Sequence, residues 1–206
     1  MLFNILAIIS LVIVLMTLRR LVGVFPSLMA CLIRWKESVN LEDSVQLSID
    51  RNILALALFI PFCLTAWRFD LYVPAFADGL DETAGLGVII GIVLLFASVR
   101  KTLEFFLRPK KNNGKAYQAA CRASRTFFSL LTLALLAMGS VMTFVDVPAE
   151  TITSAMLWVS AAIYLIFIIR KTQILMSSAS FFAAFLYLCA LEIIPTGAII
   201  ASAIVF

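Results

Sequence analysis

The sequence predicts an all-α fold, a polytopic membrane bundle of about six transmembrane helices with one short interfacial helix. Three observations predict it: an excess of apolar residues, their grouping into long stretches, and the basic residues between those stretches. Of the 206 residues, 63% are hydrophobic and 14% are charged, whereas soluble domains are about half apolar and a quarter charged. A soluble fold of this length could not bury so much apolar surface, so we expect one integral membrane domain over residues 1–206.

A membrane helix needs about 20 mostly apolar residues and tolerates about 17. The stretches that meet or nearly meet this length are Leu2–Leu18, Asn52–Trp67, Ala84–Val99, Phe127–Val145, Ile152–Ile169 and Phe181–Phe206. Leu21–Trp35 is a shorter apolar stretch that contains Gly23 and Pro26, so we expect it to be an interfacial or re-entrant helix. The third span is expected to continue as a helix beyond the membrane and to end at Pro109.

The basic residues predict the orientation of the chain. If Arg19 and Arg20 lie in the cytoplasm and six spans alternate, every Lys and Arg except Arg68 falls on the cytoplasmic side. A crossing by Leu21–Trp35 would place the basic loop Arg100–Arg125 outside, so the positive-inside rule argues against that crossing. We therefore predict a multi-pass protein of the bacterial inner (cytoplasmic) membrane with both termini in the periplasm.

The loop after the third span supplies a cytoplasmic basic surface. Its position beside two spans favours contact with anionic lipid headgroups over contact with nucleic acid. A membrane protein partner, an acidic cytoplasmic partner and a second copy of the chain remain open as alternatives. The surface comprises Arg100, Lys101, Arg108, Lys110, Lys111, Lys115, Arg122 and Arg125.

The residue inventory excludes several kinds of chemistry. The chain has no histidine, and its four cysteines show no C-x-x-C spacing, so we expect no Cys/His metal site and no disulfide framework. No P-loop, G-x-S-x-G or H-E-x-x-H motif occurs. We therefore expect that the protein is not an enzyme and binds no cofactor.

Glu192 and Pro195 interrupt the apolar run FLYLCALEIIPTG, Phe185–Gly197. Counted from Phe181, Glu192 is about 17 Å into the membrane, where an ionised carboxylate is costly and no Lys or Arg is expected. The carboxyl group either satisfies the backbone that Pro195 leaves unpaired or forms a proton or ion site at a broken helix. The hydroxyl groups predicted as its partners belong to Ser140, Thr143 and Ser160.

Small residues indicate where helices could approach closely. Gly87 and Gly91 form a G-x-x-x-G sequence in the third span, and Gly197 forms a looser pair of small residues with Ala201. Such positions allow close helix contacts, and we expect packing within the chain in preference to dimerisation.

Two stretches share an R-K-T sequence, SVRKTLEF at Ser98–Phe105 and IIRKTQIL at Ile168–Leu175. They indicate either a parallel internal repeat, as some transporters contain, or the general preference for Arg and Lys where a span ends. We favour the second interpretation.

The run LYLCALEIIP, Leu186–Pro195, resembles the C-terminal signature of an uncharacterised family of multi-pass inner-membrane proteins of Bacteroidota, domain of unknown function 4271. The spacing from IIRKTQIL to this run and the basic loop after the third span are similar to the layout of that family. That family often has a basic tail after the signature, whereas this chain has apolar residues at Ile204–Phe206. The resemblance implies a bacterial multi-pass membrane protein without an assigned activity, and it draws attention to Leu186, Tyr187, Glu192 and Pro195.

Two functional hypotheses follow. In the first, which we favour, the protein is a non-enzymatic membrane subunit or an assembly (scaffold) factor. In the second, it is a small proton- or ion-linked transporter or channel that uses Glu192 at a helix broken by Pro195. The scarcity of polar residues within the spans favours the first, because coupled transporters usually carry more of them.

Overall fold

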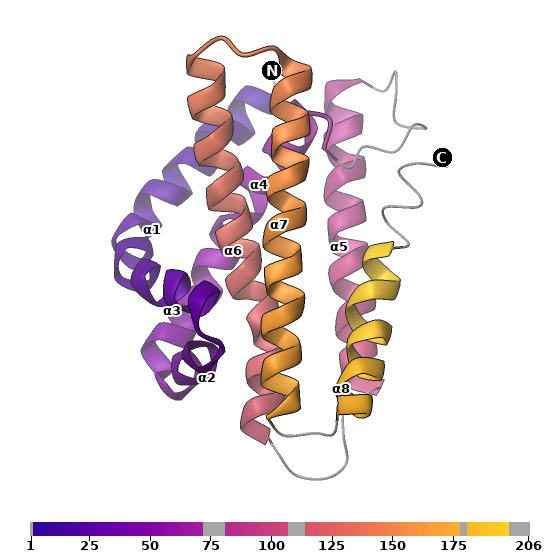
Figure 1. Ribbon diagram of the computed structural model, residues 1–206. Helices are drawn as coiled ribbons and strands as arrows, with labels where there is room; N and C mark the ends of the chain where they lie inside the picture. Colours follow the sequence, from indigo (N-terminus) through magenta and orange to yellow (C-terminus); the bar gives the residue numbers. More distant parts are fainter. Residues whose placement is uncertain (1, 72–80, 107–113, 178–180, 198–206) are drawn as a thin grey trace.

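The computed structural model describes residues 2–71, 81–106, 114–177 and 181–197, and every regular element in these ranges is a helix (Figure 1). The all-α prediction is therefore confirmed. The elements are α1 (Leu2–Ile33), α2 (Trp35–Asp43), α3 (Val45–Ala57), α4 (Phe59–Arg68), α5 (Glu82–Phe106), α6 (Gly114–Phe144), α7 (Ala149–Met176), α8 (Phe181–Leu188) and the π-helix η2 (Cys189–Ile193).

Five helical segments are long and apolar enough to cross a membrane. They are Asn4–Ile33, Val45–Arg68, Thr83–Phe106, Tyr117–Phe144 and Ala149–Met176. The first five predicted spans overlap these segments in the same order, and each lies within its segment to within two residues at either end. The sixth, Phe181–Phe206, is described only as far as Gly197, where it includes a shorter apolar helix, Ala184–Gly197.

The first helix differs from the prediction. α1 continues without a break to Ile33, so Leu21–Trp35 is not a separate interfacial or re-entrant helix. Pro26 lies inside α1, and this helix does not run straight (Figure 1). Apolar packing compensates for the backbone bond that Pro26 removes, because Val24 and Leu28 are fully buried. Their partners in this part of the core are Leu54, Leu58 and Leu130.

A second proline divides the predicted second span into α3 and α4. Pro61 has no N–H to donate to the carbonyl of Ala57, and α3 ends at that residue. The interruption at Leu58 is short. Helical hydrogen bonding resumes there, because the N–H of Phe62 donates to the carbonyl of Leu58 at 3.0 Å. The two helices therefore remain one nearly continuous apolar segment.

The long helices α6 and α7 lie side by side along the length of the bundle, with α5 on the other side of α7 (Figure 1). Helices α1 to α4 cover α6, and α8 with η2 lies against α5 and α7. One core cluster joins α4, α6 and α7 through Phe62, Leu135 and Met156. α7 also contacts α1 and α2, which are distant from it in the sequence.

Close helix contact occurs at a glycine other than those predicted. A Cβ atom added at Gly85 would lie 1.9 Å from Cη2 of Trp67, so only glycine fits against that ring. A Cβ atom added at Gly87, Gly91 or Gly197 would meet nothing within 4 Å among the described residues. The described residues therefore place no helix against these three glycines, and their packing role stays a prediction.

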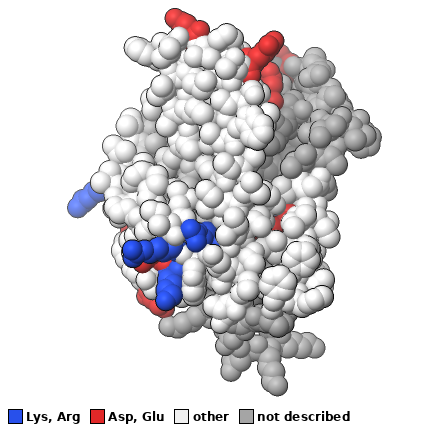
Figure 2. Space-filling view, in the orientation of Figure 1, with Lys and Arg blue, Asp and Glu red and all other residues white. Residues whose placement is uncertain are grey.

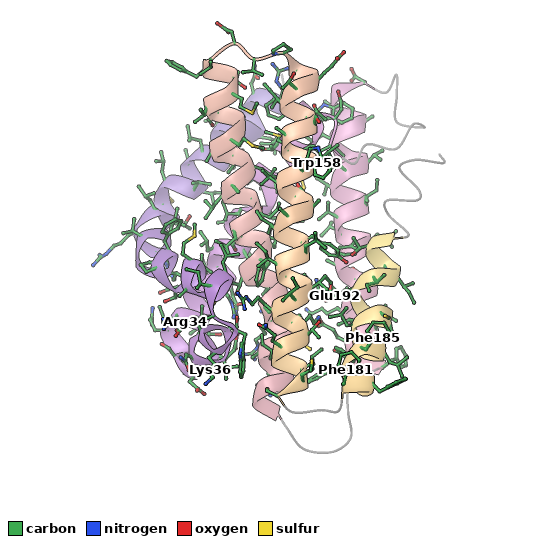
Figure 3. All side chains as sticks on the ribbon, viewed as in Figure 1. Arg34, Lys36, Trp158, Phe181, Phe185 and Glu192 are labelled. Atoms are coloured by element: carbon green, nitrogen blue, oxygen red, sulfur yellow. The ribbon has the colours of Figure 1, made fainter. Side chains whose placement is uncertain are left out.

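Charge is divided between the two ends of the molecule. Acidic side chains lie at the end where α6 connects to α7, and a group of basic side chains lies nearer the opposite end (Figure 2). Exposed Asp146 and Glu150 belong to the first group, and exposed Arg34 and Lys36 lie toward the other end (Figure 3). This separation is the one on which the predicted orientation depends.

Candidate functional site

Charged side chains from α5, α7 and η2 meet inside the bundle. The carboxylate of Glu192 accepts hydrogen bonds from Nη2 of Arg100 and from Nζ of Lys171, and both contacts are ion pairs. The exposed side-chain fractions are 1% for Glu192, 0% for Lys171 and 13% for Arg100. These three residues are named the Glu192 cluster, and Figure 3 shows Glu192 where η2 faces α5 and α7.

The backbone around Glu192 forms hydrogen bonds over five residues in place of the four of an α-helix. The N–H of Ile194 donates to the carbonyl of Cys189, five residues earlier, which is the π-helical pattern. Pro195 follows at once and has no N–H to contribute to the helix. The hydroxyl of Tyr164 donates to the carbonyl of Glu192 at 3.3 Å, so α7 supplies a donor at this irregular turn.

Aromatic rings and a second carboxylate surround the two cations. The ring of Phe167 lies 5.6 Å from the guanidinium carbon of Arg100 and 5.6 Å from Nζ of Lys171. On the open side of the cluster, Nε of Arg100 lies 3.6 Å from Oε1 of Glu104. Two cations thus face two carboxylates, the pairing that buried charges require.

The structure corrects the predicted partners of Glu192. Ser140 and Thr143 lie near the far end of α6, and the hydroxyl of Ser140 donates to the carbonyl of Leu136 at 2.7 Å. Ser160 is buried, and its hydroxyl has no hydrogen-bond partner among the described residues. The expectation that these hydroxyls serve Glu192, with no cation at its level, is therefore wrong.

The predicted depth of Glu192 was wrong because it took Phe181 as the edge of the membrane. Between Glu150 and Lys171, α7 rises about 32 Å, which is the whole hydrocarbon thickness. Glu192 lies level with Lys171, near the end of the apolar part of α7, and not at its middle. Arg100 is 92 residues from Glu192 in the chain, so no spacing rule could have joined them. The available signal was a Lys directly after an apolar run.

The two R-K-T sequences do not place equivalent residues in equivalent positions. In the first, Arg100 points into the cluster and Lys101 is exposed. In the second, Lys171 points into the cluster, and Nε of Arg170 donates to the carbonyl of Leu32 at 3.0 Å. The difference favours basic residues at span ends over an internal repeat.

A second carboxylate, Glu42 of α2, also lies between two cations. It accepts hydrogen bonds from Nη1 of Arg51 in α3 and, at 2.5 Å, from Nη1 of Arg122 in α6. The exposed side-chain fractions are 1% for Arg51 and 42% for Arg122. Arg51 also donates to the hydroxyl of Ser48 and to Oδ1 of Asn52. Glu42, Arg51 and Arg122 are named the Glu42 cluster.

Only some residues of the predicted basic surface are exposed in the structure. Arg100 of α5 is largely buried in the Glu192 cluster, where it forms an ion pair with Glu192 of η2. Lys101 and Arg125 are exposed, and Nη1 of Arg125 donates to Oδ1 of Asn52 at 3.0 Å. Arg122 is partly exposed to solvent and forms an ion pair with Glu42. The members that lie outside the described residues are Arg108, Lys110, Lys111 and the side chain of Lys115.

The described residues gather no other recognisable chemistry. All four cysteines carry free thiols. Within the described ranges, no three His, Cys, Asp or Glu side chains come together to hold a metal ion. The two ion-pair clusters are therefore the buried groups of charge in the described part of the chain.

The fold defines the class: an all-helical protein whose apolar helices could cross a membrane. The chain belongs to the family described as Domain of unknown function (DUF4271), which matches residues 3–202. The resemblance carried by Leu186–Pro195 is thereby confirmed. No curated protein and no solved structure matches the chain.

Proposed function

We propose that this chain is a non-enzymatic membrane subunit or an assembly (scaffold) factor. The single observation that carries the proposal is the closed Glu192 cluster, in which Glu192 is paired with cations from two other helices. Breaking a buried pair of this kind is costly, so the cluster serves to hold η2 against α5 and α7. Because the carboxylate of Glu192 is occupied in holding helices together, it is not free to bind a substrate.

A surface for a partner is supplied by phenylalanines at the ends of α5 and α8. Each is at least half exposed, and Phe181 and Phe185 lie stacked with ring centroids 6.4 Å apart (Figure 3). Phe106 lies about 9 Å past Arg100 along its helix, and Phe181 about 17 Å before Glu192, so both extend beyond the level of the cluster. Exposed apolar groups there favour contact with another protein. The phenylalanine surface comprises Phe105, Phe106, Phe181, Phe182 and Phe185.

Purification of a tagged full-length chain from its own membranes in a mild detergent tests the subunit role. We expect a membrane protein to be recovered at a fixed ratio, and Phe181→Ser with Phe182→Ser to lose it. Trp158→Ser is the matched control, because Trp158 is 75% exposed on α7 but lies outside the phenylalanine surface (Figure 3). Recovery of the chain alone in repeated purifications would contradict the proposal.

The proposed location is the bacterial inner membrane, with both termini in the periplasm. It is supported by the distribution of Lys and Arg and by the family resemblance. In this orientation, exposed Lys101 and Arg125 meet anionic lipid headgroups on the cytoplasmic side. A reporter fused after Phe206 should be active in the periplasm, and activity in the cytoplasm would exclude this orientation.

A proton- or ion-linked transporter or channel is the second candidate. One specific observation favours it: Glu192 lies in a π-helix next to Pro195, and such irregular helices are common at functional and transport sites. Purified protein in liposomes that contain a pH-sensitive dye would then show a flux that Glu192→Gln removes and Glu42→Gln retains. Equal flux through the parent and Glu192→Gln would eliminate this candidate.

A further inference from the structure

An open groove between α4 and α6 belongs to neither ion-pair cluster. Its volume is about 400 Å³, within the range of pockets that bind small ligands. Its lining residues are Thr65, Phe69, Leu135, Leu136, Gly139, Ser140, Thr143 and Phe144. The proposed function makes no use of this groove.

The groove follows the half of α6 that is remote from Arg125. From Arg125, α6 rises about 15 Å to Leu135 and about 28 Å to Phe144. Half of a hydrocarbon core of about 30 Å is about 15 Å. With Arg125 at the cytoplasmic edge, the groove therefore extends from the bilayer middle to its outer edge, the depth of one leaflet.

The groove presents an apolar surface despite its hydroxyl groups. The hydroxyl of Thr65 donates to the carbonyl of Pro61 at 2.8 Å, and that of Ser140 donates to Leu136 within α6. Gly139 lets the ring of Phe69 come close, since an added Cβ would lie 3.2 Å from it. Because the hydroxyls of Thr65 and Ser140 are used within their own helices and most of the other lining residues are apolar, the groove suits a hydrocarbon chain better than a polar ligand.

The mouth of the groove carries charges of both signs. Arg68 is three residues after Thr65, so it lies on the same side of α4 as this lining residue and at the end of that helix. Asp70 follows Phe69, and Asp146 lies two residues after Phe144. Arg68, Asp70 and Asp146 are all exposed. One cation and two carboxylates thus flank an apolar groove of leaflet depth.

We propose that the groove binds one acyl chain of an outer-leaflet phospholipid whose headgroup carries both a phosphate and a primary ammonium group, as in phosphatidylethanolamine. Arg68 binds the phosphate, and Asp70 or Asp146 accepts a hydrogen bond from the ammonium group. A headgroup with phosphate but no ammonium, as in phosphatidylglycerol, would face two carboxylates with one cation. The site also gives a role to Arg68, the exception to the predicted positive-inside distribution.

Lipid retention by the full-length protein tests this site. The protein is placed in nanodiscs with equal amounts of phosphatidylethanolamine and phosphatidylglycerol, and native mass spectrometry counts the lipids that it keeps on release. We expect the parent to keep one phosphatidylethanolamine in preference to phosphatidylglycerol. Ser140→Phe, which fills the groove, and Arg68→Gln, which removes roughly one charged hydrogen bond to the phosphate, should each lower this retention about tenfold.

Matched controls separate the groove from a general effect on the membrane surface. Val141→Phe adds the same side chain at an exposed position of α6 that does not line the groove, and Arg19→Gln removes an exposed base elsewhere. Both should retain lipid as the parent does. Thr143→Phe is a second filling variant should Ser140→Phe not fold, as judged by its gel-filtration profile. Equal retention of the two lipids by the parent, or parental retention in a folded filling variant, would overturn the site.

Discussion

The Glu192 cluster and the Glu42 cluster share one arrangement of charge but differ in their surroundings. In each, one carboxylate lies between two cations, and one of those cations is fully buried. Around Glu192, the second cation is largely buried and the neighbours are aromatic rings. Around Glu42, the second cation is 42% exposed and the neighbours include the polar side chains of Ser48 and Asn52.

This difference teaches that the environment of an ion pair decides what the pair contributes. A buried cation that loses its carboxylate must find another acceptor or remain unpaired, which is costly. Beside Glu192, Lys171 has the ring faces of Phe167 and Tyr187 nearby, whereas Arg51 retains a hydroxyl and an amide oxygen as acceptors. The same substitution should therefore have unequal effects in the two clusters.

The largest effect is expected for Glu192→Gln. This substitution leaves Lys171 and Arg100 facing an amide inside the bundle, and we expect it to lower the free energy of unfolding by about 3–5 kcal/mol. Unfolding of the purified protein by SDS in mixed micelles measures the change. Parental stability of this variant would contradict the holding role of the cluster.

Removing both partners should be less harmful than removing the carboxylate alone. In the double variant Glu192→Gln with Lys171→Met, no ammonium group remains buried, and we expect recovery of about 2 kcal/mol relative to Glu192→Gln. The same unfolding assay on the parent, both single variants and the double variant completes a double-mutant cycle. Additive losses would mean that the two side chains do not act as a pair.

A smaller effect is expected for Glu42→Gln. Arg51 keeps Ser48 and Asn52 as acceptors, and Arg122 can turn to solvent, so we expect a loss of about 1–3 kcal/mol. The comparison with Glu192→Gln is direct, because both variants replace one carboxylate by its amide. An equal or greater loss for Glu42→Gln would reverse the ranking of the clusters.

The smallest effect is expected for Arg122→Gln. Its side chain is 42% exposed, so water and salt screen the pair, and we expect a loss of less than about 1 kcal/mol. Repeating the unfolding assay at low and high salt should show this loss shrinking as salt rises. The effect of Glu192→Gln should change little with salt, because that pair is not exposed. Similar salt responses of the two variants would remove the distinction between the clusters.

Much of the fold could be predicted because lipid imposes simple requirements. An apolar stretch of sufficient length becomes a helix with its backbone bonds satisfied internally, and α5, α6 and α7 contain the spans expected there. The separate helix expected over Leu21–Trp35 does not occur, whereas Pro61 does separate α3 from α4. A proline removes the same donor in both places, and buried apolar residues flank both, so the local sequence does not distinguish them.

By itself, the sequence determined the helical class, the position of the five long apolar segments and the family, because composition and short motifs act locally. It also identified Glu192 as unusual, since a carboxylate in an apolar run has few acceptable surroundings. Only the tertiary structure decided which cations meet Glu192, that Arg100 is largely buried and that Gly85 lies in close contact with Trp67. Those contacts join residues far apart in the chain, and their formation depends on how whole helices are set against one another.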